Sequence, residues 1–212
     1  MDKRLKRILL VVYVLALVAV GASATFAYFA IIEVSNVSPQ VQTSTATTDW
    51  LIFNVGDPIY INANDRNFGE GMGDLSGSTF GSALLRVTNS DTVVSYRYNV
   101  VLNIANNDFE YTTSGNTAEL LLTVKNPEGN EVTSIPGLKY VTVTNGDGEM
   151  ISGFDITTGL GDYYIVQNQL ISTNREVEQV WNVDVTFVNL ASDQGANMGK
   201  TFNGTLRVEM AS

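Results

Sequence analysis

The chain contains neither histidine nor cysteine, and these two absences remove most of the usual catalytic chemistry. Histidine is the commonest general base, and histidine and cysteine are the usual protein ligands of zinc and copper. Without cysteine there is also no thiolate nucleophile and no disulfide. The nucleophile-elbow, phosphate-loop and Ser-x-x-Lys motifs are missing as well. We therefore expect a protein that is not an enzyme and binds no cofactor or metal in a catalytic role.

Basic residues are scarce, with 12 Lys and Arg against 22 Asp and Glu and a net charge of −10. Four of the basic residues lie in the first seven positions, so the rest of the chain is still more acidic. Such a surface repels nucleic acid and anionic lipid, because phosphate binding depends on Lys and Arg. We expect no nucleic-acid partner, and we interpret the acidity as a source of solubility.

The N-terminus has the layout of an export signal. A basic stretch precedes an uncharged apolar run from Ile8 to Ile32 that contains the small residues expected at a signal-peptidase site. Cleavage after Ala27 would remove residues 1–27, and the alternative cleavage after Ala24 would remove residues 1–24. Either cut would place the rest outside the cytoplasm, secreted or at the cell surface. The run is also long enough to span a bilayer, so an uncleaved anchor is the alternative. In either case the leader is the only expected contact with a membrane.

Residues 49–212 show the period-two alternation of half-buried strands. The clearest runs are Val94 to Ile104, Trp181 to Phe187 and Phe202 to Met210. Shorter candidates are Trp50 to Phe53, Pro58 to Ala63, Ala83 to Thr88, Leu120 to Lys125, Tyr140 to Thr144 and Tyr163 to Gln167. Many short strands separated by turn residues predict one all-β domain, an antiparallel β-sandwich of jelly-roll or immunoglobulin-like type. Helical turns are conceivable only in Asn106 to Glu119 and Glu149 to Thr158, which are poor helix formers.

Two features of this domain have both a structural and a ligand-binding interpretation. Asn145-Gly146-Asp147-Gly148-Glu149 resembles a calcium loop but lacks the EF-hand spacing, and Asn-Gly between two apolar runs favours a hairpin turn. The alternating aromatic residues favour the core over a carbohydrate platform. They are Tyr96, Tyr98, Trp181 and Phe187. Adjacent strand residues face opposite sides, so one of Tyr163 and Tyr164 is expected at the surface.

Several stretches resemble the TasA and camelysin family of exported proteins from Gram-positive bacteria. They are Ala24-Thr25-Phe26-Ala27-Tyr28-Phe29 at the end of the leader, Leu85-Arg86-Val87-Thr88-Asn89-Ser90 leading into Tyr96-Arg97-Tyr98, Val183-Asp184-Val185-Thr186-Phe187-Val188-Asn189, Asp193-Gln194, and Gly199-Lys200-Thr201-Phe202-Asn203-Gly204-Thr205-Leu206. The resemblance implies a jelly-roll subunit of an extracellular biofilm-matrix fibre, released by a dedicated signal peptidase. It also implies that the segment after the cut can leave its own subunit and complete the sheet of the next. Camelysin-like members were described as metalloproteases, but a chain without histidine cannot hold zinc in that way, so protease activity is not carried over.

Residues 28–48 are the candidate donor strand for such a fibre. Ile32 and Val34 alternate first, and Val37 and Val41 alternate after a shift of register, while Pro39 suits an edge or a break. An extended segment that joins a sheet edge gains main-chain hydrogen bonds and pockets for alternate side chains. The alternative is a flexible stalk or the domain's own first strand.

Three functions remain open from the sequence. The first is a structural subunit that assembles with itself, head to tail, by strand addition. The second is a monomeric, membrane-anchored adhesin or glycan-binding module. The third is a hydrolase that uses two carboxylates, which would need them about 5 to 9.5 Å apart in a cleft.

Overall fold

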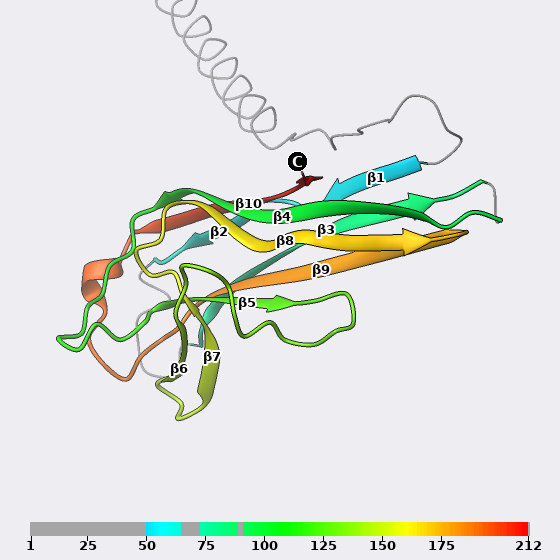
Figure 1. Ribbon diagram of the computed structural model, residues 1–212. Coiled ribbons are helices and arrows are strands. Elements are labelled where there is room, and N and C mark those ends of the chain that lie inside the picture. The colour runs from blue at the N-terminus through cyan, green and yellow to red at the C-terminus, as the bar shows by residue number, and fades with distance from the viewer. Residues whose placement is uncertain (1–49, 65–72, 89–90, 212) are drawn as a thin grey trace, which may run out of the picture. The chain divides into compact units, whose positions relative to one another are not determined.

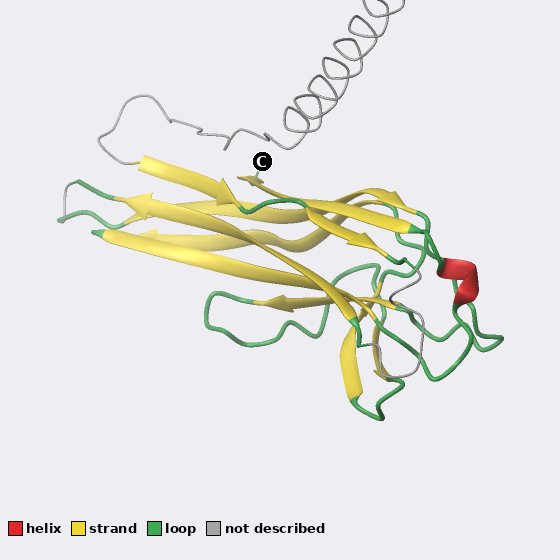
Figure 2. Cartoon of the chain, turned by 180° about the vertical axis from the view of Figure 1, so that it is seen from behind, coloured by secondary structure: helices red, strands yellow, loops and turns green. Residues whose placement is uncertain are grey.

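The alternating runs of the sequence form ten strands in the computed structural model, which describes residues 50–64, 73–88 and 91–211. The strands are β1 (Trp50–Val55), β2 (Ile59–Asn62), β3 (Leu75–Arg86), β4 (Val94–Asn107), β5 (Leu120–Lys125), β6 (Tyr140–Thr144), β7 (Met150–Asp155), β8 (Gly161–Thr173), β9 (Glu176–Phe187) and β10 (Thr201–Met210). Within these residues, a 3₁₀ turn, η2 (Gly195–Asn197), is the only helical element (Figure 2). The described residues all belong to one compact unit.

The strands form two antiparallel sheets (Figure 1). The larger sheet has the order β1-β3-β9-β5-β7-β6, and the smaller has the order β2-β10-β4-β8. The prediction of an all-β, antiparallel fold is therefore confirmed. The long pairs β3 with β9 and β4 with β8 form the body of the two sheets, whereas the short β6–β7 hairpin projects from it (Figure 1).

The order of pairing follows a simple rule along the chain. Strands β4 and β5 each pair with two later strands, since β4 also pairs with β10 and β5 also pairs with β9. In addition, each of the strands β2 to β5 pairs with the strand at the mirrored position among β7 to β10. The pairs are β5 with β7, β4 with β8, β3 with β9 and β2 with β10. Strands β1 and β6 extend the larger sheet at its two edges.

One apolar cluster joins the two sheets and forms the core. It contains the inward residues of the three predicted long runs, among them Val100 and Leu102 of β4 and Val183 and Val185 of β9, all fully buried. Their neighbours Asn103, Asn182 and Arg207 face outward, as period two requires. Met210 departs from the prediction, because at the end of β10 it is 38% exposed.

Glycine 81 lets the sheets approach closely. It faces the core from β3, and a Cβ at that position would lie 2.9 Å from Cγ2 of Val208 on β10. That distance is shorter than any ordinary carbon–carbon contact. A larger residue at Gly81 would therefore push β3 and β10 apart.

Several strands differ from the sequence prediction, and β8 and β9 extend well beyond the predicted Tyr163 to Gln167 and Trp181 to Phe187. Strand β3 begins at Leu75 rather than at Ala83, because its polar first half is held in register by β9 from Leu75↔Phe187 onward. Strand β7 occupies the stretch in which a helical turn was considered, and it pairs with β6 from Thr144↔Met150 to Tyr140↔Phe154. The stretch Asn106 to Glu119 contains no helix either.

Candidate functional site

The residues predicted to act in export and assembly lie outside the described part of the chain. They are Ala24 and Ala27 at the candidate cleavage sites and Ile32, Val34, Val37 and Val41 in the candidate donor strand. The described chain starts at Trp50, a few residues after that segment. Across the described residues, no helix combines the length and the apolar character that a bilayer span needs. The described residues include the sheet edges to which a donor strand would add, but not the donor segment itself.

Among the described strands, four have a neighbour on one side only and form the sheet edges: β1 and β6 in the larger sheet, and β2 and β8 in the smaller. The backbone N–H and C=O groups on the open side of an edge strand are a template for another chain. Natural proteins block such edges with short strands, bulges or charges. The four edges can be compared by these criteria.

The edges of the smaller sheet are both blocked. Strand β2 has only four residues. Strand β8 is long, but its register with β4 shifts twice, and Asn168 at the irregularity has φ 57°. The irregularity is fixed by hydrogen bonds, because Arg97 Nη1 donates to the Asn168 carbonyl at 2.7 Å and Asn168 N donates to Asn99 Oδ1 at 2.9 Å. A bulge of this kind bends the strand and prevents regular pairing along it.

Strand β1 is the longest edge with an unbroken register. Its six residues pair with β3 from Trp50↔Arg86 to Val55↔Gly81 without a shift. It contains no charge, no proline and no bulge. Strand β6, at the other edge of the same sheet, has five residues. By length and regularity β1 is the best template for strand addition among the described edges.

The side chains of β1 anchor it and also leave apolar surface beside its open edge. Leu51 and Phe53 are 7% and 3% exposed, and the Phe53 ring centroid lies 6.1 Å from that of Tyr98. On the opposite face Ile52 is half-buried and Trp50 is 55% exposed. A strand beside β1 would thus meet apolar side chains on both faces, while β1 itself stays fixed in the core.

Beneath β1, the predicted core aromatic residues are joined by hydrogen bonds. Trp181 Nε1–H donates to Tyr98 Oη at 3.0 Å, and the Tyr98 hydroxyl donates to Gln179 Oε1 at 2.7 Å. Burial raises the pKa of Tyr98 to about 12, against the smaller lowering effect of the Trp181 hydrogen bond. Tyr98, Trp181 and Phe187 are buried and Tyr96 is half-buried, so the core interpretation is confirmed. Tyr164 is the more exposed of its pair, at 37%.

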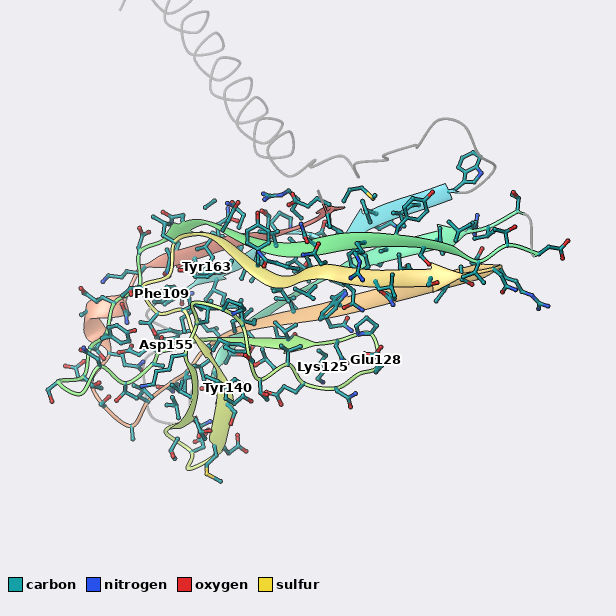
Figure 3. The ribbon with its side chains drawn as sticks, in the orientation of Figure 1. Phe109, Lys125, Glu128, Tyr140, Asp155 and Tyr163 are labelled. Carbon is teal, nitrogen blue, oxygen red and sulfur yellow. The ribbon has the colours of Figure 1, made fainter. Side chains whose placement is uncertain are left out.

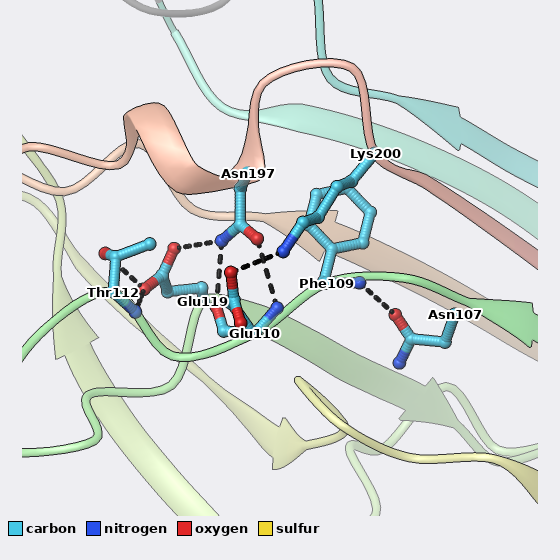
Figure 4. Close-up of polar contacts among 7 residues, drawn as sticks. All are labelled: Asn107, Phe109, Glu110, Thr112, Glu119, Asn197 and Lys200. Atoms are coloured by element: carbon cyan, nitrogen blue, oxygen red, sulfur yellow. Dashed lines mark hydrogen bonds and ion pairs between the residues drawn. The ribbon is translucent and has the colours of Figure 1, made fainter.

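At the end of the sandwich near η2, the carboxylate of Glu119 is completely buried and joins two loops (Figure 4). Its Oε1 accepts from the N–H and the hydroxyl of Thr112, both at 2.6 Å. Its Oε2 accepts from Gln194 Nε2 at 2.7 Å and Asn197 Nδ2 at 2.8 Å. Asn197 also donates to the carbonyl of Glu110, whose carboxylate pairs with Lys200 at 2.6 Å. Four donors occupy the carboxylate, so it orders the loops rather than facing a cleft.

No local pattern in the sequence indicates this cluster. The partners Gln194 and Asn197 come 75 and 78 residues after Glu119. They are ordinary polar residues in a turn-rich stretch, and only the fold brings them to Glu119. The sequence offers no candidate residues for the carboxylate pair of a hydrolase. Glu119 is not a member of such a pair, because protein donors occupy both of its oxygens.

The predicted turn between β6 and β7 is confirmed. Asn145 N donates to the Glu149 carbonyl at 2.9 Å, and Gly148 has φ +83°, a conformation that favours glycine. The side-chain oxygen of Asn145 accepts from the N–H groups of Asp147 and Glu149 at 3.1 and 2.8 Å. The amide of Asn145 thus serves to close the turn.

No group of three or more acidic ligands that could hold a metal ion occurs in residues 50–64, 73–88 and 91–211. Comparison of the chain with known protein families and with curated proteins finds no match. The resemblance to the TasA and camelysin family therefore stays a prediction.

Proposed function

We propose that this protein is a structural subunit of an extracellular fibre or biofilm matrix, exported through its N-terminal leader. Subunits assemble head to tail when the segment of residues 28–48 of one copy adds as a strand to the β1 edge of the next. The observation that carries the proposal is the β1 edge, which is uncharged, regular and six residues long. Long regular edges without charge or bulge are the ones that pair with other chains.

We also propose that the sandwich is a jelly roll. The support is the pairing of each of the strands β2 to β5 with the strand at the mirrored position among β7 to β10, which is the arrangement of a long hairpin rolled into two sheets. The eight strands of this arrangement give the orders β2-β10-β4-β8 and β3-β9-β5-β7. Strand β1 is then an addition next to β3, and none of the other described strands lies along its outer edge.

The donor segment fits the chemistry of that edge. A strand beside β1 gains main-chain hydrogen bonds and places alternate side chains against the two faces of the larger sheet. Val37 and Val41 alternate in the segment, and a valine that becomes fully buried contributes about 1.5–3 kcal/mol. The donor segment and the β1 edge are different surfaces, so the contact is heterologous. Heterologous contacts that do not close into a ring produce open filaments.

The absence of cysteine provides a clean test by cross-linking. One preparation carries a single cysteine in the donor segment, at Ile32, Val34, Val37 or Val41 in turn. A second preparation carries Asn54→Cys on β1. The two are mixed, allowed to assemble and oxidised. We expect a covalent dimer for at least one donor position, because facing residues of neighbouring strands bring their Cβ atoms to about 4.5–5.5 Å, close to disulfide distance.

Thr142→Cys on β6 is the matched control, since it is exposed on the other edge of the same sheet. Cross-links to Thr142→Cys but not to Asn54→Cys would show that β6 is the acceptor. Both cysteines can also be placed in one chain. If that chain forms only an internal disulfide at every dilution, the segment is the domain's own strand and the proposal is wrong.

A further inference from the structure

The outer face of the larger sheet contains a polar cleft that the proposed assembly does not use. Its volume is about 510 Å³. Strands β3, β9 and β5 form its floor, and the loop between β1 and β2 borders it with Gly56 and Asp57. Figure 3 places Lys125, one of the lining residues, at the end of β5.

The floor of the cleft is a regular array of side chains from three neighbouring strands. The register aligns Ser78 of β3 with Asp184 of β9, and it aligns Phe80 of β3 with Asn182 of β9 and Lys125 of β5. Neighbouring strands lie about 4.8 Å apart, so the array is roughly 10 Å wide, the length of a disaccharide. The positions are fixed by the sheet rather than by a loop, which is the arrangement of a preformed site.

Phe80 provides the apolar part of this array. It is 41% exposed, whereas the aromatic residues of the core are buried. The loop between β1 and β2 is bonded to the backbone of β3 at Phe80, because Gly56 N donates to the Phe80 carbonyl at 2.8 Å. A Cβ on Gly56 would lie 3.0 Å from Phe80 Cδ1, so glycine allows the loop to lie against the ring.

The polar side chains around Phe80 have hydrogen-bonding capacity to spare. Within the described residues, Asp57, Asn182 and Asp184 have no side-chain hydrogen bond or ion pair. Thr79 lies between Ser78 and Phe80, so its side chain faces the core side of β3, as the position of Gly81 does, and it does not add a polar group to the floor of the cleft. Asp57 and Asn182 are exposed and Asp184 is half-buried, so their side-chain oxygens and amide group are open to a ligand in the cleft.

We infer that this cleft binds a neutral polysaccharide, with a sugar ring stacked on Phe80. A pyranose has an apolar C–H face that fits an exposed aromatic ring and hydroxyls that pair with carboxylate, amide and hydroxyl groups. The cleft contains the carboxylates of Asp57 and Asp184 but one lysine, Lys125, so it is negatively charged overall. This charge disfavours anionic ligands such as phosphates, uronic acids and nucleic acid. An apolar small molecule is disfavoured too, because sites for such ligands are mainly apolar and this one is mainly polar. If the subunits form the proposed fibre, each subunit binds adjacent subunits through β1 and matrix glycan through this cleft.

The test is a titration of end-labelled neutral hexasaccharides of glucose, mannose and galactose, followed by fluorescence anisotropy, with the purified full-length chain. We expect saturable binding of at least one of them. Phe80→Ala should weaken it about tenfold through loss of stacking. Asp184→Asn should weaken it about fivefold by replacing a charged acceptor with a neutral amide.

The matched controls are Tyr164→Ala, an exposed aromatic residue on the other sheet, and Glu178→Gln, an exposed carboxylate on β9 outside the cleft. Both should bind as the unaltered chain does. The inference is overturned if no neutral hexasaccharide binds, if Phe80→Ala binds normally, or if an oligouronate binds as tightly as the neutral sugars. Circular dichroism melting of each variant separates lost binding from lost folding.

Discussion

The buried carboxylate of Glu119 allows a sharp test of how the loops near η2 are held. Replacing it with alanine removes the acceptor of four hydrogen bonds. Two of the donors keep another partner, since Gln194 Nε2 lies 3.0 Å from the Val188 carbonyl and Asn197 Nδ2 lies 2.8 Å from the Glu110 carbonyl. The N–H and hydroxyl of Thr112 lose the acceptor that they share.

The magnitude follows from these partners. A buried donor left without an acceptor costs about 1–3 kcal/mol, and because Thr112 is half-buried its two donors account for about 2–3 kcal/mol. The two amides lose charge-assisted bonds, but removal of a buried charge also relieves its desolvation. We therefore expect Glu119→Ala to lower the free energy of unfolding by about 3–5 kcal/mol. For a domain of this size that corresponds to a melting temperature roughly 10 °C lower. Glu119→Gln keeps one acceptor oxygen and should lose about half as much.

Urea unfolding of the full chain, followed by the fluorescence of the buried Trp181, measures this difference. Glu178→Ala is the control, because Glu178 is exposed and its replacement should change the free energy by less than about 0.5 kcal/mol. A loss below about 1 kcal/mol for Glu119→Ala would refute the reasoning. It would mean that the loops are held by other contacts and that water replaces the carboxylate without cost.

Further predictions concern the core and the donor segment. Trp181→Ala should cost roughly 3–5 kcal/mol in urea unfolding, because it empties a buried site and removes the donor to Tyr98; a loss under about 1 kcal/mol would contradict the core assignment. Stability should fall as pH rises from about 10 to 12, because the unfolded chain releases the Tyr98 proton near pH 10 and the folded chain only near 12. Tyr98→Phe should flatten this pH dependence, and an unchanged slope would show that Tyr98 does not cause it. Lysine at Val34 and Val41 should leave the melting temperature nearly normal but prevent elongation in light scattering, because an unpaired charge is costly in an apolar pocket.

The sequence predicted the strands whose two faces differ in polarity. Val94 to Ile104 alternates because one face of β4 covers the core and the other meets solvent, and the pattern can be read without the fold. The first half of β3 carries Ser76, Ser78 and Thr79, so it lacks this pattern. It is a strand because β9 pairs with it, and that partner lies about a hundred residues later in the chain. Contacts of this range are set by the fold as a whole.

The candidate sites illustrate the same limit. Trp50 to Phe53 is recognisable as a strand, but whether a strand lies at an edge depends on its neighbours. Among the described strands, β1 is at an edge because β3 is its single neighbour. The polar cleft combines Asp57, Phe80, Lys125 and Asp184 from four separate stretches, and none of them belongs to a motif. Export and strand donation, in contrast, are predicted from continuous segments, since charge, hydropathy and alternation are local properties.

Electron microscopy of the exported chain, compared with the same chain lacking Ile31 to Thr43, tests the central proposal most directly. We expect the unaltered chain to form filaments. The shortened chain should remain monomeric with a near-normal melting temperature, because the β1 edge and the core are intact and only the donor is missing. Unaltered chains that stay monomeric at high concentration, or shortened chains that still form filaments, would contradict assembly by strand donation.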